Sequence, residues 1–435
     1  MQDIHEVLDR RAVTPVFQPL VDIATGRILG YEALSRGPAG TPWESPATLF
    51  AAARVAGRES ELDWICRAVA YRAALDAGFP PDLMLFVNME PTAWRAGCPA
   101  DLAPIVERAR RRLRVVTEMT ERAIAQDPAG LLAAVESCRT AGWGVALDDV
   151  GADPMSLAML PFVHSDVVKL DMGLLRAPDD PNTARVVAAV YAYAESSGAT
   201  VLAEGIETPR HLAAARTMGA TVGQGWHYGR PGPLPEFTAP FTTGRTPALP
   251  MLSEARIGST SGGLRLPGRP VDGDRTPFEV ISAVRPVTRT TKSQLMPLSR
   301  HLEALAGDAE PPVLLACFQE ARHFTPATMA RFRRIAAHSP LVAALGAGLP
   351  VEPVPGVRGA CLGDDRLRGE WNVILVGPHR AAALVARDLG DDGPDTERRF
   401  DFAITHDRAL VIEAARSVLR HLAPVDTPIL EALAV

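Results

Sequence analysis

Five carboxylates and one lysine stand at the ends of short apolar runs in this 435-residue chain. Residues 145–157 read VALDDVGADPMSL, where the run ends on the adjacent Asp148 and Asp149. Other runs end on Glu32, Asn88, Glu118, Lys169, Glu204 and Gln224. Carboxylates a few ångströms apart repel by roughly 1 kcal/mol per pair in water, and by about 4 kcal/mol at an effective dielectric constant of about 20. A cluster of five must therefore take up protons or bind cations.

A divalent metal site is the chemistry that these side chains suit best. Their donors are oxygens, which favour Mg²⁺ or Mn²⁺, whereas zinc prefers His or Cys, and neither type ends one of these runs. Two aspartates and three glutamates exceed the needs of one octahedral ion, so we expect two ions, an arrangement that suits in-line displacement at phosphorus. Asp148 is the expected bridge, and Lys169 would position or deprotonate the attacking water or neutralise developing charge. Taken singly, each acidic residue is more simply a helix N-cap or a solvated loop residue.

Repeated β-α units are predicted from residue 13 to residue 235, and they would position these groups. Short β-branched runs alternate with Ala-, Leu- and Arg-rich segments of helical period. The expected strands cover residues 14–21, 28–35, 84–89, 115–118, 144–147, 167–170, 200–203 and 222–225. The first two are separated only by DIATGR, which predicts an antiparallel hairpin. This pattern favours one α/β barrel, in which the carboxyl ends of the parallel strands meet at one rim.

The composition is that of an ordinary globular chain. Hydrophobic residues make up 47%, and 51 acidic against 45 basic residues leave a formal net charge of −6. This balance gives no general attraction to a nucleic acid polymer or to an anionic membrane. We expect a cytoplasmic protein without a membrane span, because neither a signal-like N-terminus nor an apolar run of roughly 18 residues is present. Only two lysines occur, Lys169 and Lys292, so each is a candidate for a role that arginine does not fill.

Residues 13–235 resemble the EAL domain, the family of bacterial cyclic di-GMP phosphodiesterases. The resemblance is carried, in family order, by FQPLVDIATGRILGYEALSR, LFVNMEP, TEMTE, ALDDVG, VVKLD, AEGIE and QGWHYGRP. It implies a TIM-type (β/α)8 barrel with an antiparallel first strand, dependence on Mg²⁺ or Mn²⁺, and a homodimer formed through the barrel. It also implies hydrolysis of cyclic di-GMP to linear pGpG.

The same resemblance gives roles to single residues. One ion would be held by Glu32, Asn88, Glu118 and Asp148, and the second by Asp148, Asp149 and Glu204. Lys169 and Gln224 would contact the attacking water or its surroundings, while Gln18 and Arg36 would bind substrate, Arg36 through a phosphate. Glu121 matches a position that holds the loop after the paired aspartates. Asp63 would contact a guanine or ribose, or is a charge on a helix surface.

The loop after Asp149, GADPMSL, departs from the family pattern. The family reads DDFG and then small-Gly-aromatic-Ser-Ser, whereas this chain has Val150, Asp153, Pro154 and Met155 in place of the Phe, the second Gly, the aromatic residue and the first Ser. In the family this loop couples dimerisation to metal binding. Loss of glycine and gain of proline narrow the range of backbone conformations that the loop can adopt. The metal ligands are all present, and we expect only their regulation to be altered. Asp153 is either a solvated turn residue or an additional metal ligand.

A second domain is expected after a linker. The barrel domain is assigned to residues 1–235, the linker, rich in Pro, Gly, Ser and Thr, to residues 236–275, and a tail to residues 425–435. Residues 276–424 resemble the DICT domain, a sensory module of cyclic di-GMP and two-component signalling proteins, through segments such as ACFQEARHFTPATMARFRRIA and LRGEWNVILVGPHRAAALVARDLG. The expectation is a smaller α/β sensory domain that takes an unknown small-molecule or protein signal.

Within this second domain, strands are expected at residues 312–318, 371–376 and 400–405, and helices at residues 293–306, 325–337 and 406–422. Lys292 is a candidate for a ligand or interdomain contact. The residues Arg322, His323, Trp371, His379 and Arg380 would line a pocket, or else occupy the core and the surface.

We therefore expect a cyclic di-GMP phosphodiesterase modulated by a C-terminal sensory domain. One rival is a barrel that binds cyclic di-GMP without cleaving it and signals to a partner protein. The joint presence of Glu32, Asn88, Lys169 and Glu204 disfavours this rival, because non-catalytic members commonly lose one or more of them. Another rival is a metal-dependent barrel enzyme that acts on a sugar phosphate or an enolisable acid.

Overall fold

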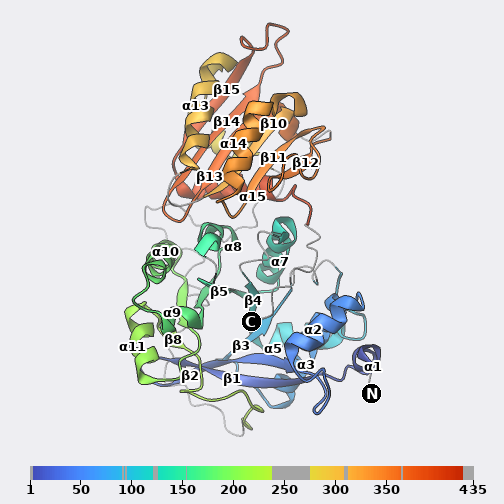
Figure 1. Cartoon of the computed structure of the whole chain (residues 1–435). Coiled ribbons are helices and arrows are strands. Elements are labelled where there is room, and N and C mark those ends of the chain that lie inside the picture. The colour runs from blue at the N-terminus through green and yellow to red at the C-terminus, as the bar shows by residue number, and fades with distance from the viewer. Residues whose placement is uncertain are drawn as a thin grey trace. The chain divides into compact units, whose positions relative to one another are not determined.

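The computed structural model describes residues 3–90, 93, 96–120, 126–152, 154–237, 275–307, 312–363 and 366–424, with the backbone alone for 154–156. The chain divides into two compact units, the first built mainly on a closed barrel and the second on a seven-stranded sheet (Figure 1). The predicted linker falls largely on residues 238–274, which lie outside the described residues. Its boundaries therefore stay predictions.

Eight strands in chain order close the barrel. β1 (Thr14–Asp22) and β2 (Ile28–Arg36) form an antiparallel hairpin. The next strands run parallel to β2 and are β3 (Met84–Asn88), β4 (Arg114–Thr120), β5 (Gly144–Val150), β6 (Val167–Leu170), β7 (Thr200–Ala203) and β8 (Val222–Gly223). β1 pairs antiparallel with β8 and so closes the ring. This confirms the expected TIM-type barrel with an antiparallel first strand.

Helices connect the strands, and three of them begin at a residue whose side chain caps the helix. In order they are α1 (Ile4–Asp9), α2 (Pro46–Val55), α3 (Glu59–Asp76), α5 (Ala103–Arg112), α7 (Pro128–Thr140), α8 (Leu160–Val163), α9 (Met172–Arg176), α10 (Pro181–Ser197) and α11 (Pro209–Thr217). The short 3-10 helix η1 (Pro154–Met159) precedes α8. α10 begins after Asp180, whose side chain accepts a hydrogen bond from the Asn182 N–H, and it ends at Gly198 with a φ of 69°.

The interior of the barrel is packed with apolar side chains rather than open. Its buried cluster comprises Leu20, Leu29, Met84, Phe86, Val116, Ala146, Val167, Leu202 and Val222. Full burial of a large aliphatic or aromatic side chain contributes roughly 1.5–3 kcal/mol. These nine residues therefore form a stable apolar layer, the floor, beneath the strand ends.

The second unit is a mixed sheet in the order β12-β11-β10-β13-β14-β15-β9. Its strands are β9 (Thr288–Thr291), β10 (Val313–Glu320), β11 (Val342–Ala347), β12 (Arg358–Cys361), β13 (Glu370–Val376), β14 (Ala381–Asp388) and β15 (Arg399–Thr405). β10, β11 and β12 are parallel to one another, and the remaining pairs are antiparallel. This confirms a second, smaller α/β domain.

Helices cover both faces of this sheet. α13 (Lys292–Leu305) and α14 (Pro326–Ala336) share one core with alternate strand residues such as Leu314, Val373 and Leu384 (Figure 1). α12 (Pro277–Ser282) and α15 (Arg408–Leu419) pack against each other and on β13 and β14. Two 3-10 turns, η4 (Ala321–His323) and η5 (Arg366–Gly369), follow β10 and precede β13. Thr325 caps α14 by accepting from the Thr328 N–H, as expected of the Thr-Pro pair at its start.

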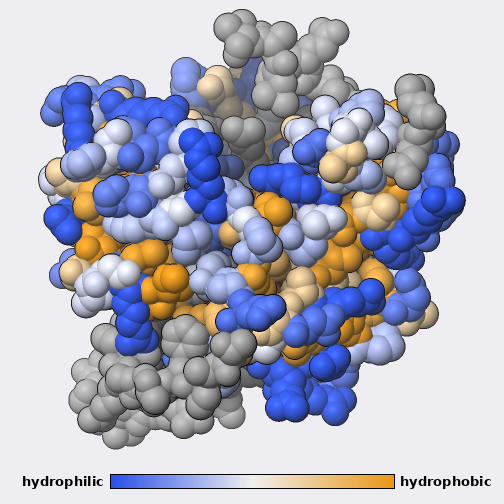
Figure 2. Space-filling model, turned by 90° about the horizontal axis from the view of Figure 1, so that it is seen from below, coloured by the Kyte–Doolittle hydropathy of each residue, from blue (hydrophilic) through white to orange (hydrophobic). Residues whose placement is uncertain are grey.

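The surface mixes polar and apolar residues. On the face seen in Figure 2, hydrophobic residues lie between hydrophilic ones and form no single continuous band. Among the residues that the structure describes, no helix combines the length and the apolar character that crossing a bilayer requires.

Candidate metal centre and active site

Each polar strand-end residue from β3 to β8 follows a floor residue by two positions. Side chains alternate between the two faces of a strand, so residues i and i+2 both point into the barrel. The pairs are Phe86 and Asn88, Val116 and Glu118, Ala146 and Asp148, Val167 and Lys169, Leu202 and Glu204, and Val222 and Gln224. Glu32 on β2 completes the set, because Gln224 and Asn88 both donate hydrogen bonds to it. The barrel thus brings the predicted strand-end residues to one rim.

Lys169 lies at the centre of the carboxylates. Its ammonium nitrogen is 2.7 Å from oxygens of both Glu118 and Glu204. The same nitrogen is 2.9 Å from Asp148 Oδ1 and 3.8 Å from Glu32 Oε2. The side chain is only 1% exposed, so this charge is withdrawn from water and balanced by carboxylates alone. A buried ammonium needs such partners, because an unpaired charge in the interior is strongly unfavourable.

The clustered charges shift the ionisation of one another. Burial raises the pKa of Glu204 to about 8, and Asp148 and Glu32 add to this rise while Lys169 opposes it. Burial and then Glu32 raise the pKa of Glu118 well above its ordinary value. Burial alone would lower the pKa of Lys169, but the surrounding carboxylates, led by Asp148, more than reverse this and raise it. The site is therefore rich in negative charge that one ammonium does not fully satisfy.

Two amide side chains, Gln224 and Asn88, fix the orientation of Glu32, and Gln18 in turn accepts from Gln224. Gln224 Nε2 donates to Glu32 Oε2 at 2.5 Å and to Gln18 Oε1 at 3.1 Å, and Asn88 Nδ2 donates to Glu32 Oε1 at 3.1 Å. Gln18 lies directly opposite Glu32 in the β1–β2 register and donates to the Gly229 carbonyl at 3.0 Å. Burial opposes ionisation of Glu32, but Lys169 and the amide donors offset it and hold the pKa of this carboxyl below its usual range. Glu32 is therefore a fixed carboxylate.

Gly225 lets the chain turn directly after Gln224. Its φ of +149° is one that glycine adopts readily and other residues rarely do. A Cβ atom at this position would stand 2.2 Å from the Ile206 carbonyl oxygen. The glycine of the QGW block is therefore required by close approach of two backbone segments, and it helps to place Gln224.

The two adjacent aspartates face one site because the strand is irregular between them. Neighbours in a regular strand point to opposite faces. Here Asp149 has a φ of +56°, and the pairing of β5 with β6 shifts register between Leu147 and Val150. As a result, one oxygen each of Asp148, Asp149 and Glu204 lies within 4.8 Å of the others. The sequence predicted both aspartates as ligands, but no sequence signal revealed the left-handed residue that brings the second one to the site.

These side chains suit a hard divalent cation. Both Glu118 oxygens and Asp148 Oδ1 are buried, and they accept no well-directed hydrogen bond from the described residues. The only positive charge beside them in the described structure is the Lys169 ammonium. Unsatisfied buried carboxylate oxygens call for a cation, and an all-oxygen set matches Mg²⁺ or Mn²⁺. Asp148, Asp149 and Glu204 are the three carboxylates that already lie close enough to share one ion.

The structure places the remaining predicted residues differently. Arg36 ends β2 four residues after Glu32, half-buried and on the same rim, and it donates to the Ser35 carbonyl at 2.7 Å. Asp63 is 2% exposed within α3, so it is not a charge on a helix surface. Glu121 and Asp153 lie outside the described residues, as do the side chains of Pro154 and Met155.

Asp63 has a structural set of partners that the sequence did not reveal. Its carboxylate forms an ion pair with Arg67 at 2.5 Å and accepts from the Glu90 N–H at 2.9 Å. Arg67 also stacks on Trp64, 3.8 Å from the ring centroid. These contacts join α3 to the segment that follows β3 and Asn88. They favour a supporting role for Asp63 over the predicted contact with a guanine or ribose.

Comparison with known proteins gives the family of the barrel. The EAL domain matches residues 1–231, which is more than half of the chain. The chain belongs to the EAL domain family. A second match, to the DICT domain, the "Sensory domain in DIguanylate Cyclases and Two-component system", covers residues 280–389.

Relatives of this EAL domain protein include described cyclic di-GMP enzymes. The probable cyclic di-GMP phosphodiesterase PdeB of Escherichia coli is 29% identical over 238 residues, covering 54% of this chain and 45% of that protein. The bifunctional diguanylate cyclase/cyclic di-GMP phosphodiesterase MucR of Pseudomonas aeruginosa is 27% identical over 260 residues, covering 55% of this chain and 36% of that protein. The chain thus spans less than half the length of these curated relatives.

A solved structure of Klebsiella pneumoniae BlrP1 in a manganese and cyclic di-GMP complex is also similar. It is 27% identical, has a TM-score of 0.45, and is matched over 51% of this chain and 56% of that chain.

Proposed function

We propose that the barrel hydrolyses cyclic di-GMP to linear pGpG at a site for two divalent ions, Mg²⁺ or Mn²⁺. The observation that carries the proposal is the rim itself, where Glu118, Asp148 and Glu204 oxygens converge within 2.9 Å of one buried ammonium. A chain that only bound the dinucleotide would have no need to gather so many carboxylates against their mutual repulsion.

The family resemblance gives two overlapping ligand sets, and the closeness of Asp148, Asp149 and Glu204 supports one of them. Glu32, Asn88, Glu118 and Asp148 would hold one ion, and Asp148, Asp149 and Glu204 the other. When bound, such ions make a coordinated water more acidic and stabilise the negative charge that builds up on the phosphate. In the overall step, a water oxygen bonds to phosphorus while the bond from phosphorus to one ribose oxygen breaks. The single linear product carries both a terminal phosphate and the freed hydroxyl, and no redox partner is needed.

Lys169 would act as a fixed positive charge. Of the three roles expected from the sequence, deprotonating the water is disfavoured, because the surrounding carboxylates raise the pKa of Lys169 and keep it protonated. A charged, preorganised donor can stabilise negative charge on the attacking and phosphoryl oxygens without moving during the reaction. Gln224 would keep Glu32 in place through the hydrogen bond at 2.5 Å.

Gln18 and Arg36 would meet the substrate at the edge of the metal site. Arg36 is suited to a phosphate, because a guanidinium offers two parallel N–H groups to one anionic group. Gln18 accepts a hydrogen bond from Gln224, which lies on the rim beside the proposed metal ligands. A substrate contact at Gln18 would therefore help to position the substrate next to the metal ligands.

The second domain would modulate the barrel, and the barrel would form a homodimer. Both statements rest on the family resemblance. The fusion of a sensory DICT domain to the barrel supports the first. Sedimentation velocity on the full chain, with and without Mn²⁺, tests the second.

The direct test is turnover by the purified full chain. Cyclic di-GMP is incubated with Mg²⁺ or Mn²⁺, and products are separated by chromatography. We expect pGpG to form, and Glu32→Ala and Lys169→Met each to lower the rate by about 10²–10⁴-fold. Glu107→Ala is the matched control, since this carboxylate lies on α5 and pairs only with exposed Arg111 among the described residues.

The outcomes separate the candidate functions. Binding of cyclic di-GMP without product under either metal would replace the enzyme with a receptor that signals to a partner protein. Absence of binding, together with turnover of a sugar phosphate, would favour the unrelated barrel chemistry. Equal loss in Glu107→Ala would mean that the site variants act through general destabilisation.

A further inference from the structure

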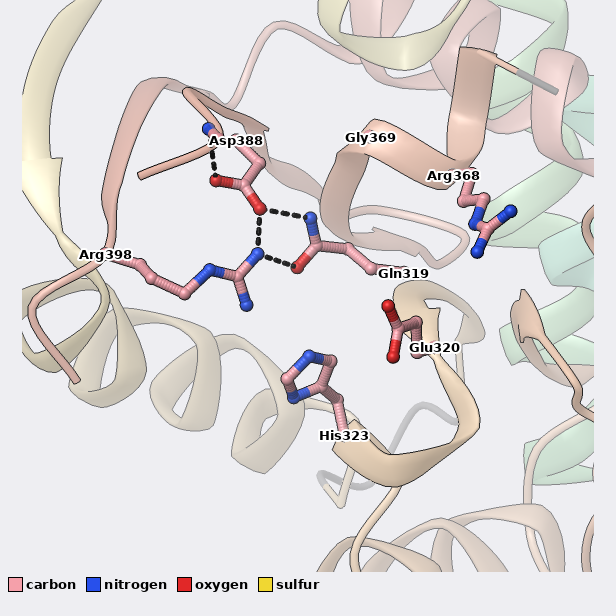
Figure 3. Close-up of a pocket in the computed structure, with 8 residues that line it drawn as sticks. Gln319, Glu320, His323, Arg368, Gly369, Asp388 and Arg398 are labelled. Atoms are coloured by element: carbon pink, nitrogen blue, oxygen red, sulfur yellow. Dashed lines mark hydrogen bonds and ion pairs between the residues drawn. The ribbon is translucent and has the colours of Figure 1, made fainter. Parts of the chain in front are cut away.

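A pocket of about 400 Å³ lies in the second domain, away from the sheet core. It opens between the end of β10, the turns η4 and η5, and the segment between β14 and β15. Figure 3 shows Glu320, His323, Arg368 and Arg398 around a common space. Most of its lining side chains are charged or strongly polar, which is unusual for a gap left by imperfect packing.

The wall of the pocket is built by an irregularity in β10. Gln319 has a φ of +63°, and the pairing of β10 with β11 shifts register between Cys317 and Glu320. A left-handed conformation at a residue other than glycine persists only where its surroundings hold it. Here Gln319 Nε2 donates to Asp388 Oδ2 at 3.0 Å, and Gln319 Oε1 accepts from Arg398 at 3.3 Å. The irregularity turns the buried amide to a fixed position beside the pocket.

Arg398 is held in place but keeps donors to spare. It forms an ion pair with Asp388, and a second nitrogen donates to Asp395 at 3.2 Å. Its side chain is 15% exposed, so the guanidinium is largely withdrawn from water. A guanidinium has five N–H groups, and the contacts to Asp388, Gln319 and Asp395 leave two of them without a partner among the described residues. The remaining N–H groups are available to a bound anion.

His323 presents a neutral donor to the same space. Lys292 Nζ lies 3.3 Å from His323 Nδ1, and because an ammonium only donates, Nδ1 must accept. The hydrogen of the neutral ring is then on Nε2. Burial, followed by the charges of Lys292, Arg322 and Arg398, lowers the pKa of His323, while Asp395 opposes this. The ring therefore stays neutral and directs one N–H at a ligand, and the local field is positive.

Arg368 is the charged residue of the pocket that has no ion-pair partner among the described residues. Asp388 is paired with Arg398, Glu320 with Arg322 at 2.9 Å, and Asp395 with Lys292 at 2.6 Å. Arg368 lines the pocket from η5 and is exposed, and it forms no ion pair with any of the described residues. Among the described residues, one unmatched guanidinium beside these ion pairs gives the pocket one net positive charge.

We propose that this pocket binds a small organic anion through a carboxylate or phosphate group. Arg368, His323 Nε2 and the remaining N–H groups of Arg398 would donate to the anionic oxygens, since hydrogen bonds to charged oxygens are the strong ones. Glu320 would accept from a hydroxyl or amine elsewhere on the same molecule. This inference deepens the sensory part of the proposed function by naming the site and the chemistry of the signal, and it does not depend on hydrolysis.

The test is calorimetric titration of the full chain at constant ionic strength. Divalent ions are removed beforehand with a chelating resin and cyclic di-GMP is absent, so that ions at the barrel cannot bind the probes. The probes are inorganic phosphate, succinate and the neutral succinamide. We expect saturable binding of phosphate or succinate with a Kd below about 10 mM, corresponding to a weak but specific contact. The better of the two probes identifies the anionic group.

Arg368→Gln should weaken that binding by about tenfold or more, because it removes the charge that no described residue matches. Arg366→Gln is the matched control, since Arg366 lies on the same turn but outside the pocket and pairs with Glu279. His323→Ala tests the second donor without altering a charge. The proposal is overturned if neither anion binds saturably, if succinamide binds as well as succinate, or if Arg368→Gln binds like the parent. If the anion binds as expected but the full chain does not hydrolyse cyclic di-GMP, only the proposed hydrolysis is contradicted.

Discussion

Replacing Lys169 with methionine tests whether its ammonium neutralises the carboxylates of the rim. Methionine keeps most of the volume but removes the charge, so Glu118, Asp148 and Glu204 lose a partner at 2.7–2.9 Å. Removing one partner of a buried ion pair typically costs about 3–5 kcal/mol. A unit of this size loses about 2–4 °C in Tm per kcal/mol, so we expect the barrel transition to fall by about 6–20 °C in EDTA.

The loss should depend on pH with a definite sign. Without the ammonium, the folded variant holds protons on its carboxyl groups to a higher pH than the unfolded chain does. A group whose folded pKa is raised in this way loses stability as pH rises through the interval between the two values. The deficit of Lys169→Met should therefore be larger at about pH 8 than at about pH 5.5. In the parent, burial raises the pKa of Glu204 to about 8 against the opposing effect of Lys169, so removal of the ammonium extends this interval above about pH 8.

Calorimetry of the full chain measures the effect, because it resolves more than one transition in a chain of two compact units. Mn²⁺ should stabilise the variant at least as much as the parent, since a ligand at 100 times its Kd contributes about 2.7 kcal/mol. Lys292→Met is the control, because Lys292 pairs with a half-exposed Asp395 and its removal should cost at most about 1 kcal/mol. If Lys169→Met melts like the parent in EDTA at pH 8, the ammonium does not neutralise the rim.

Three further variants test the supports of the site. Burial, and then Asp63, raise the pKa of Glu90 to about 7. Its ionisation therefore costs stability between about pH 4.5 and 7, and Glu90→Gln should be more stable than the parent by about 1–2 kcal/mol at pH 8 but not at pH 4. An equal gain at both pH values in urea unfolding would refute this. Asp63→Asn leaves Arg67 buried without its counter-charge and should lose about 3–5 kcal/mol in the same assay, where a loss below about 1 kcal/mol would contradict the ion pair. Gly225→Ala should lower turnover by about tenfold or more by displacing the adjacent glutamine, while Gly40→Ala, with a positive φ but open space, should not.

The barrel and its rim were predictable because the sequence repeats a simple period. In each of six strands an apolar residue that fills the floor is followed, two positions later, by a polar one, as in Val116 and Glu118 or Val167 and Lys169. Strand pleating then dictates that both point inward. The hairpin of β1 and β2 was equally predictable, because only the short DIATGR segment connects the two strands.

The sheet of the second domain was only partly predictable. β10, β13 and β15 were expected, whereas β11 and β14 were missed because their sequences, VAALGA and AAALVARD, are rich in alanine, which favours helices. Both strands are almost wholly buried, and small side chains fit where helices cover the two faces. In these two strands, the packing of small side chains between the helices outweighs the preference of alanine for helical structure.

Details of the site that depend on backbone distortion were beyond the sequence. Asp149 at +56° and Gln319 at +63° are left-handed residues that no local motif marks. Asp63 was assigned to substrate or surface, since nothing in the sequence indicated that Arg67 and the Glu90 N–H would enclose it. Such features arise only once distant segments have come together.

The reversed direction of β1 has a practical consequence for handling the protein. Thr14, the first residue of β1, pairs with Arg36, the last residue of β2, so the chain enters the barrel beside the metal rim. In a barrel with all strands parallel it would enter at the opposite end. An affinity tag or reporter domain fused ahead of α1 would therefore enter the barrel from the side of the candidate metal site. The exposed hairpin tip at Thr25 and Gly26 lies at the far end of the same two strands, and it is the better place to attach a label.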